Sequence, residues 1–132
     1  MYSGLYNAET VINEQSMYLV QNIEDAQALK KYGKAVVAPP DGRNDDWQDS
    51  YTEFLRGRDV AIIANNDNSG YTFSGCVSNL IGKAAKSTRI LCLKVLWPEM
   101  PDGGNAVTFF NKFGKDGVKM LSEFARDTEP CY

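Results

Sequence analysis

The amino-acid sequence predicts an α/β fold in which helices cover both faces of a mostly parallel sheet of about four strands. Short apolar runs alternate with segments of helical periodicity along the chain. The run Val60–Ile63 is uniformly apolar, as expected for a strand that helices bury on both faces. A length of 132 residues fits one domain with a sizeable core.

The first half of the chain is expected to form a strand, a helix and a second strand. Met17–Val20 is a short apolar run typical of a buried strand. Asn22 is suited to cap the following helix, whose apolar residues recur at helical spacing until Gly33 ends it. Ala35–Ala38 is the second strand, and the following Pro39 ends it because proline has no N–H to donate.

The later elements continue this alternation. Aromatic residues at helical spacing predict a helix from Trp47 to Leu55, which Gly57 ends. The remaining elements are expected as a strand at 60–63, a helix with its apolar face at 73–81, a strand at 90–96, and helices near 107–113 and 118–124.

Composition excludes several classes of function. The chain has no histidine, which excludes imidazole catalysis, histidine-ligated zinc and a Ser-His-Asp triad. With 14 basic and 17 acidic residues, its net charge of -3 argues against gripping nucleic acid by charge alone, although a local basic groove stays open. Its 3 cysteines show no metal-ligand spacing, so reduced thiols in a cytoplasmic protein are expected.

No membrane association or export is expected. No apolar run approaches the ~20 residues that span a bilayer. The start, Met1–Gly4, lacks the basic residues and apolar stretch of a signal peptide.

Ligands of open parallel sheets bind at the carboxyl ends of the strands. Three segments near these strand ends match the motifs of a known domain family: residues 19–29, 60–70 and 102–109. In this order they resemble the motifs of the Toprim domain of primases, topoisomerases and related nucleases, and most closely phage and plasmid primase-helicases. In that family one strand ends in Glu-Gly-x-x-Asp, a later one in Asp-x-Asp-x-x-Gly, and a Gly-Lys-Asp-x-x-Asp-Trp region follows the fourth strand. The resemblance covers roughly residues 15–113 and implies a Toprim-like fold.

Most of the acidic positions of the family carry amides here. Gln21 stands where the first motif has Glu, while Asp25 matches its Asp. In the second motif Asn65 replaces the first Asp, whereas Asp67 and Gly70 match. In the third region Asn105 and Thr108 stand where the acids would be, and the segment from Trp47 to Asp59 resembles the one that leads into the metal-site strand.

The resemblance implies Mg²⁺-dependent nucleotidyl transfer in active relatives, with carboxylates holding the metal. Mg²⁺ prefers carboxylate oxygens, and an amide cannot accept a proton near neutral pH, so Gln21 is not expected to act as a general base. Asp67, Asn65 and Asn105 are therefore expected to form a weak or lost metal site, although Asp67 is equally suited to be a turn or helix-capping residue. Of the cofactors, only weakly held Mg²⁺ is expected.

Several of the candidate residues have a purely structural interpretation as well as a functional one. Asp25 is interpreted as a structural charge at a helix start, and Trp47 as a structural core residue. Arg43 and Gly70 are the candidates for contact with phosphate or nucleic acid, against a solvated loop arginine and a turn glycine. A basic cluster of Lys83, Lys86 and Arg89 is expected to be ordinary surface at the opposite end of the sheet.

Two functions are carried forward. One is the Toprim domain of a primase-like replication protein with impaired or absent catalysis, which contacts nucleic acid, nucleotide or replication proteins. The other is a non-catalytic interaction module on the same scaffold. A receiver-like phosphoacceptor domain needs an acidic pair after the first strand, which Gln21 and Asn22 do not supply. Residues 1–14 are interpreted as a lead-in, 15–113 as the Toprim-like domain, and 114–132 as a helix and tail that pack on or extend it.

Overall fold

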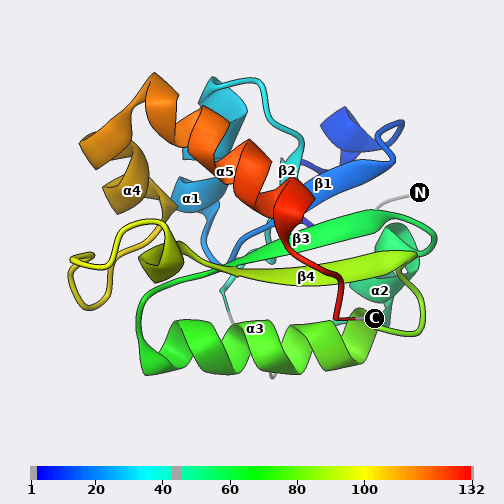
Figure 1. The fold of residues 1–132 in the computed structure, drawn as a ribbon. Coiled ribbons are helices and arrows are strands. Elements are labelled where there is room, and N and C mark those ends of the chain that lie inside the picture. Colours follow the sequence, from blue (N-terminus) through cyan, green and yellow to red (C-terminus); the bar gives the residue numbers. More distant parts are fainter. Residues whose placement is uncertain (1–2, 43–45, 132) are drawn as a thin grey trace.

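A parallel sheet forms the centre of the fold (Figure 1). The computed structural model describes residues 3–42 and 46–131. In this part of the chain the four strands lie in the order β2-β1-β3-β4, and each pair of neighbours is parallel. The strands are β1 (Ser16–Leu19), β2 (Val36–Val37), β3 (Asp59–Ala64) and β4 (Ser87–Cys92).

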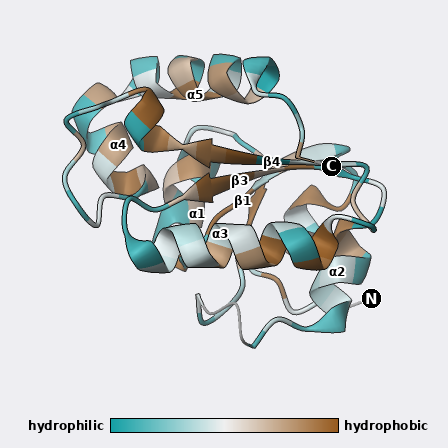
Figure 2. Ribbon diagram, turned by 60° about the horizontal axis from the view of Figure 1, so that its bottom comes forward, coloured by the Kyte–Doolittle hydropathy of each residue, from teal (hydrophilic) through white to brown (hydrophobic). Residues whose placement is uncertain are grey.

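Helices cover both faces of the sheet, which confirms the predicted α/β class (Figures 1 and 2). The helices on one face are α1 (Ile23–Lys31), α4 (Ala106–Phe113) and α5 (Lys115–Asp127). Those on the other face are α2 (Asp49–Leu55) and α3 (Asn68–Ile81).

The central strand β3 divides the core into two apolar clusters. Val60 and Ile62 point into the cluster that includes Phe73 of α3. Ala61 and Ile63 belong to the cluster that includes Phe109 of α4. Successive residues of a strand face opposite sides, so a strand buried on both faces needs a continuous apolar sequence. This is why the run at 60–63 could be recognised in the sequence.

The lead-in is part of the packed domain. Its short helix η1 (Ala8–Val11) follows an antiparallel bridge between Tyr6 and Ala38, where the Tyr6 N–H donates to the Ala38 carbonyl at 2.7 Å. Leu5 and Val11 are buried in the same apolar cluster as α2 and α3. The lead-in thus covers the β2 edge of the sheet.

The predicted bounds of the fourth strand were wrong. The strand was expected at 90–96, but β4 ends at Cys92 and the 3-10 helix η2 (Leu93–Val95) follows. Leu93 is buried through this helical turn while Val95 is exposed. An apolar run alone does not distinguish the two conformations. At the other end, β4 begins at Ser87, because polar residues also pair along the ladder with β3.

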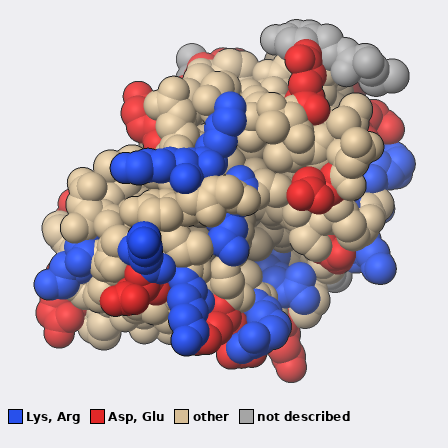
Figure 3. Space-filling model, turned by 90° about the horizontal axis from the view of Figure 1, so that it is seen from above, with Lys and Arg blue, Asp and Glu red and all other residues tan. Residues whose placement is uncertain are grey.

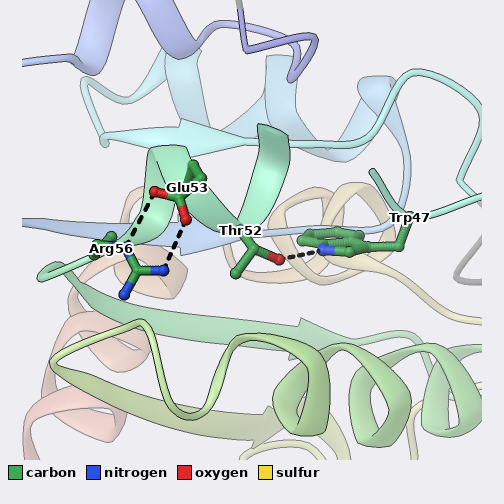
Figure 4. A network of polar contacts seen from close by, with 4 residues as sticks. All are labelled: Trp47, Thr52, Glu53 and Arg56. Atoms are coloured by element: carbon green, nitrogen blue, oxygen red, sulfur yellow. Dashed lines mark hydrogen bonds and ion pairs between the residues drawn. The ribbon is translucent and has the colours of Figure 1, made fainter. Parts of the chain in front are cut away.

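Trp47 lies just before α2 and contacts the side chains of its first turn (Figure 4). Its indole Nε1 donates to Thr52 Oγ1 at 2.8 Å, and its ring meets Tyr51 edge-on with centroids 5.0 Å apart. At the end of α2 the Arg56 guanidinium pairs with the Glu53 carboxylate at 2.7 Å on an exposed surface.

None of the described helices is long and apolar enough to cross a membrane.

Candidate functional site

Two amides from neighbouring strands meet at the carboxyl edge of the sheet. The register pairs Leu19 of β1 with Ile62 of β3, so Gln21 and Asn65 follow their strands side by side. Asn65 Nδ2 donates to Gln21 Oε1 at 3.2 Å, and both side chains are buried. The Gln21 amide also donates to the Gly42 carbonyl at 3.0 Å and to Ser69 Oγ at 3.1 Å. Gln21 and Asn65 are thus hydrogen-bonded to each other, and Ser69 connects Gln21 to the first turn of α3.

Asp67 caps α3. One oxygen of its carboxylate accepts a hydrogen bond from the Gly70 N–H at 2.6 Å. A carboxylate at a helix N-terminus satisfies a free N–H and complements the positive end of the helix dipole. The carboxylate that matches the family motif therefore already has a structural partner.

Gly70 allows α3 to start directly against the end of β3. A Cβ atom at this position would lie 2.3 Å from the Asn65 carbonyl oxygen and 2.7 Å from the Asn65 Cβ. These distances are far below van der Waals contact, so only glycine fits without a shift of the backbone. The close neighbour of Gly70 within the chain is thus the backbone of Asn65.

Asn66 connects this edge to the loop after η2, a role that sequence reasoning missed. Its buried side-chain amide donates to the carbonyls of Met100 and Pro101 at 3.2 and 3.0 Å, and its oxygen accepts from the Tyr71 hydroxyl at 2.6 Å. Its backbone N–H donates to the Gly104 carbonyl at 2.7 Å. The only signal in the sequence was its place in a polar run after a strand, which does not separate it from its neighbours.

The docked loop brings the start of α4 to the same edge. Asn105 follows Gly104 and caps α4, accepting from the Thr108 N–H at 3.0 Å. Thr108 Oγ1 accepts from the Asn105 N–H at 3.2 Å, which completes a reciprocal capping box. The two positions where the family has acids therefore bond to each other in this helix start.

Asp25 ties α1 to α4. It is fully buried, and its Oδ1 accepts a hydrogen bond from the Val107 N–H at 3.3 Å. Burial raises the pKa of the Asp25 carboxyl to about 6, although hydrogen bonds from Val107 and Asn22 favour the charged form and oppose this rise. The carboxyl thus lies between two helix N-termini rather than in solvent.

The polar side chains at this edge do not match the ligand set of a Mg²⁺ site. Gln21 and Asn65 bond to each other, Asp67 is used as a helix cap, and Asn105 is used in the capping box. Across residues 3–42 and 46–131, no group of three or more acidic or cysteine side chains gathers to hold a metal ion. Arg43, the predicted phosphate contact, lies outside the described residues.

Comparison with models of known protein families gives no match, and neither does comparison with curated proteins. Among solved structures, the chain is similar to the crystal structure of the Aquifex aeolicus primase, which holds its zinc-binding and RNA polymerase domains. The TM-score is 0.69 at 18% sequence identity, over 98% of this chain and 31% of that chain. At this identity the likeness establishes a shared fold. The present chain thus has a primase-like fold and spans about a third of the length of that structure.

Proposed function

We propose that this chain is the Toprim-type domain of a primase-like replication protein, in which the metal site has been replaced by a network of amides. It acts within reach of nucleic acid, nucleotides or other replication proteins in the cytoplasm. Catalysis by the site is weak or lost. The primase-like fold supports the first part of this proposal, and the order of the three sequence motifs along that fold supports the assignment to the Toprim type.

The hydrogen bond between Gln21 and Asn65 carries the proposal. Two carboxylates at this spacing would repel each other by on the order of 1–4 kcal/mol unless a cation lay between them. Two amides need no cation, because one donates to the other. The pair therefore keeps two buried polar groups satisfied where the family gathers charge.

The same observation favours a binding role over an enzymatic one. Phosphoryl transfer depends on positioned charge that neutralises the phosphate, and a neutral amide supplies none. The amide pair needs no cation to hold its two side chains together. The non-catalytic interaction module is the second candidate, and a natural chain that shows no thermal shift with Mg²⁺ or Mn²⁺ at millimolar concentration would favour it.

Restoring the charges tests the proposal. The variant Gln21→Glu/Asn65→Asp should bind Mn²⁺ at least about tenfold more tightly than the natural chain, because carboxylates replace neutral oxygens at one site. It should also unfold more easily in EDTA and regain stability when Mn²⁺ is added, since only the folded site holds the ion. Isothermal titration and thermal unfolding measure the two effects, and the fourfold variant with Asn105→Asp and Thr108→Asp should extend them.

Gln27→Glu/Asn111→Asp is the matched control, because it adds the same charges at exposed positions of α1 and α4. Equal metal affinity in the restored variant and this control would show that the strand ends do not correspond to a metal site. A natural chain that binds Mg²⁺ tightly would refute the replacement of the site by amides.

A further inference from the structure

A cavity of about 460 Å³ lies at the amino ends of the strands, opposite the edge that holds Gln21 and Asn65. Its floor is formed by the first residues of β1 and β3, including Tyr18 and Ala61. Ala125 from the last turns of α5 borders it. The cavity volume falls in the range of about 300–1,000 Å³ typical of small-molecule sites.

Basic side chains from three separate elements line this cavity. They are Lys34 before β2, Arg89 of β4 and Arg126 of α5. Asp59 is the carboxylate among the lining residues; it accepts hydrogen bonds from Ser87 and Gln15, and its charge also interacts with Arg89, so the three cations outweigh it. The molecule as a whole carries a net charge of -3, so this lining departs from the overall charge. Figure 3 shows blue side chains beside a hollowed part of the surface on the helical face that includes α5.

Arg89 is held in place. Its Nε donates to the Thr128 carbonyl at 2.7 Å and its NH1 donates to Ser87 Oγ at 3.1 Å. These two bonds orient the guanidinium plane, and the NH2 nitrogen takes part in neither of them. A fixed guanidinium loses little freedom when it binds a planar or tetrahedral anion. Arg126 also contacts Asp127 at 3.3 Å, but both side chains are exposed, and an exposed pair of this kind is weak.

We propose that this cavity binds a small organic anion, which places one phosphate or carboxylate group among Lys34, Arg89 and Arg126 and an apolar, flat body on Tyr18 and Ala61. The charges recognise the anionic group, and the half-buried Tyr18, which lines the cavity beside Ala61, offers a surface for the body. The cavity mixes apolar floor and charged rim, which is the usual make-up of a small-molecule site. The inference does not rest on the proposed function, because the cavity lies at the other end of the sheet.

Binding of phenyl phosphate and benzoate tests this inference, with inorganic phosphate as the probe that lacks an apolar body. We expect phenyl phosphate or benzoate to bind at least about tenfold more tightly than inorganic phosphate, since only the former bury an apolar ring. The tighter of the two identifies the anionic group. Amide chemical shifts at Tyr18 and Ala61 should move on titration, which locates the ligand in this cavity.

Two variants and one control make the test specific. Lys34→Gln/Arg126→Gln removes two rim charges and should weaken binding about tenfold or more. Ala125→Phe fills the mouth from α5 and should block the aromatic probes. Lys119→Gln/Arg56→Gln removes the same charges from exposed positions outside the cavity and should leave binding unchanged. Equal losses in the charge variant and the control, or no binding of either aromatic probe at millimolar concentration, would overturn the inference.

Discussion

At the scale of single residues, Asp25 shows how a short polar side chain can join two helices. Its position near the start of α1 suits a negative charge, because the N-terminus of a helix carries a partial positive charge. The N-terminus of α4 adds a second one, through the Val107 N–H. These two contacts hold a carboxyl that is otherwise removed from water, and burial raises its pKa to about 6.

This buried carboxyl predicts a pH dependence of stability. The pKa is higher in the folded state (about 6) than the ordinary value of 3.8, so the folded protein holds a proton that the unfolded chain has already released. The free energy of unfolding contributed by Asp25 should therefore fall as the pH rises from about 4 to about 6, and stay constant above. The two values differ by roughly two pKa units, equivalent to about 3 kcal/mol.

Asp25→Asn should remove this dependence. Urea unfolding at a series of pH values should show the stability of the variant rising relative to that of the natural chain by roughly 2 kcal/mol between pH 4.5 and 7.5. Asp116→Asn is the control, because Asp116 stands in the first turn of α5 but is exposed. If both variants followed the same pH profile as the natural chain, the carboxyl of Asp25 would not carry the raised pKa.

At the scale of elements, the junction between β3 and α3 sets the shape of the candidate site. The helix starts so close to the strand end that a Cβ at Gly70 would overlap the backbone of Asn65. That closeness brings Ser69 within 3.1 Å of the Gln21 amide and lets Asp67 cap the helix. The junction therefore positions both the amide pair and the Asp67 carboxylate.

Gly70→Ala should open this junction. The added Cβ would force α3 away from Asn65, at a cost of about 1–3 kcal/mol in the free energy of unfolding, as is typical of overpacking. Gly75→Ala in the same helix meets no atom within 4 Å and should instead stabilise the protein by up to about 1 kcal/mol through helix propensity. Chemical denaturation compares the two, and equal stabilities would contradict the close approach.

At the scale of the whole molecule, the lead-in and the domain share one core. Leu5 and Val11, from the segment 1–14 interpreted as a lead-in, are buried in the cluster built by the sheet, α2 and α3. Residues that bury apolar surface in the same cluster are expected to unfold together. The strand order places β2 at the edge, and the bridge between Tyr6 and Ala38 covers it.

Leu5→Ala tests this shared core. Loss of the buried side chain should lower the free energy of unfolding by about 2–4 kcal/mol while unfolding stays a single transition. Ile12→Ala removes a side chain that is 50% exposed and should change stability by less than about 1 kcal/mol. A second, earlier transition in circular dichroism of Leu5→Ala would show that the lead-in unfolds by itself.

The class of fold could be predicted because its signals are local. Val60–Ile63 is apolar throughout since both faces of β3 are buried, and this pattern is visible without any tertiary contact. The bounds of β4 could not be predicted, because Leu93 is buried equally well from a helical turn as from a strand. The last residue of the edge strand β4 is set by its backbone pairing with β3. A run of apolar residues in the sequence does not show where that pairing stops.

By itself, the sequence determined the alternation of elements, the uniformly apolar strand and the placing of Gln21 and Asn65 directly after strands. Tertiary structure alone decided what their side chains do. Gln21 and Asn65 are 44 residues apart, and Asp25 and Val107 are 82 apart, yet each pair shares a hydrogen bond. A polar group loses its water when it is buried and must find a partner there. The partner is set by which chain segments the fold brings together, so the sequence names the candidates and only the packed molecule pairs them.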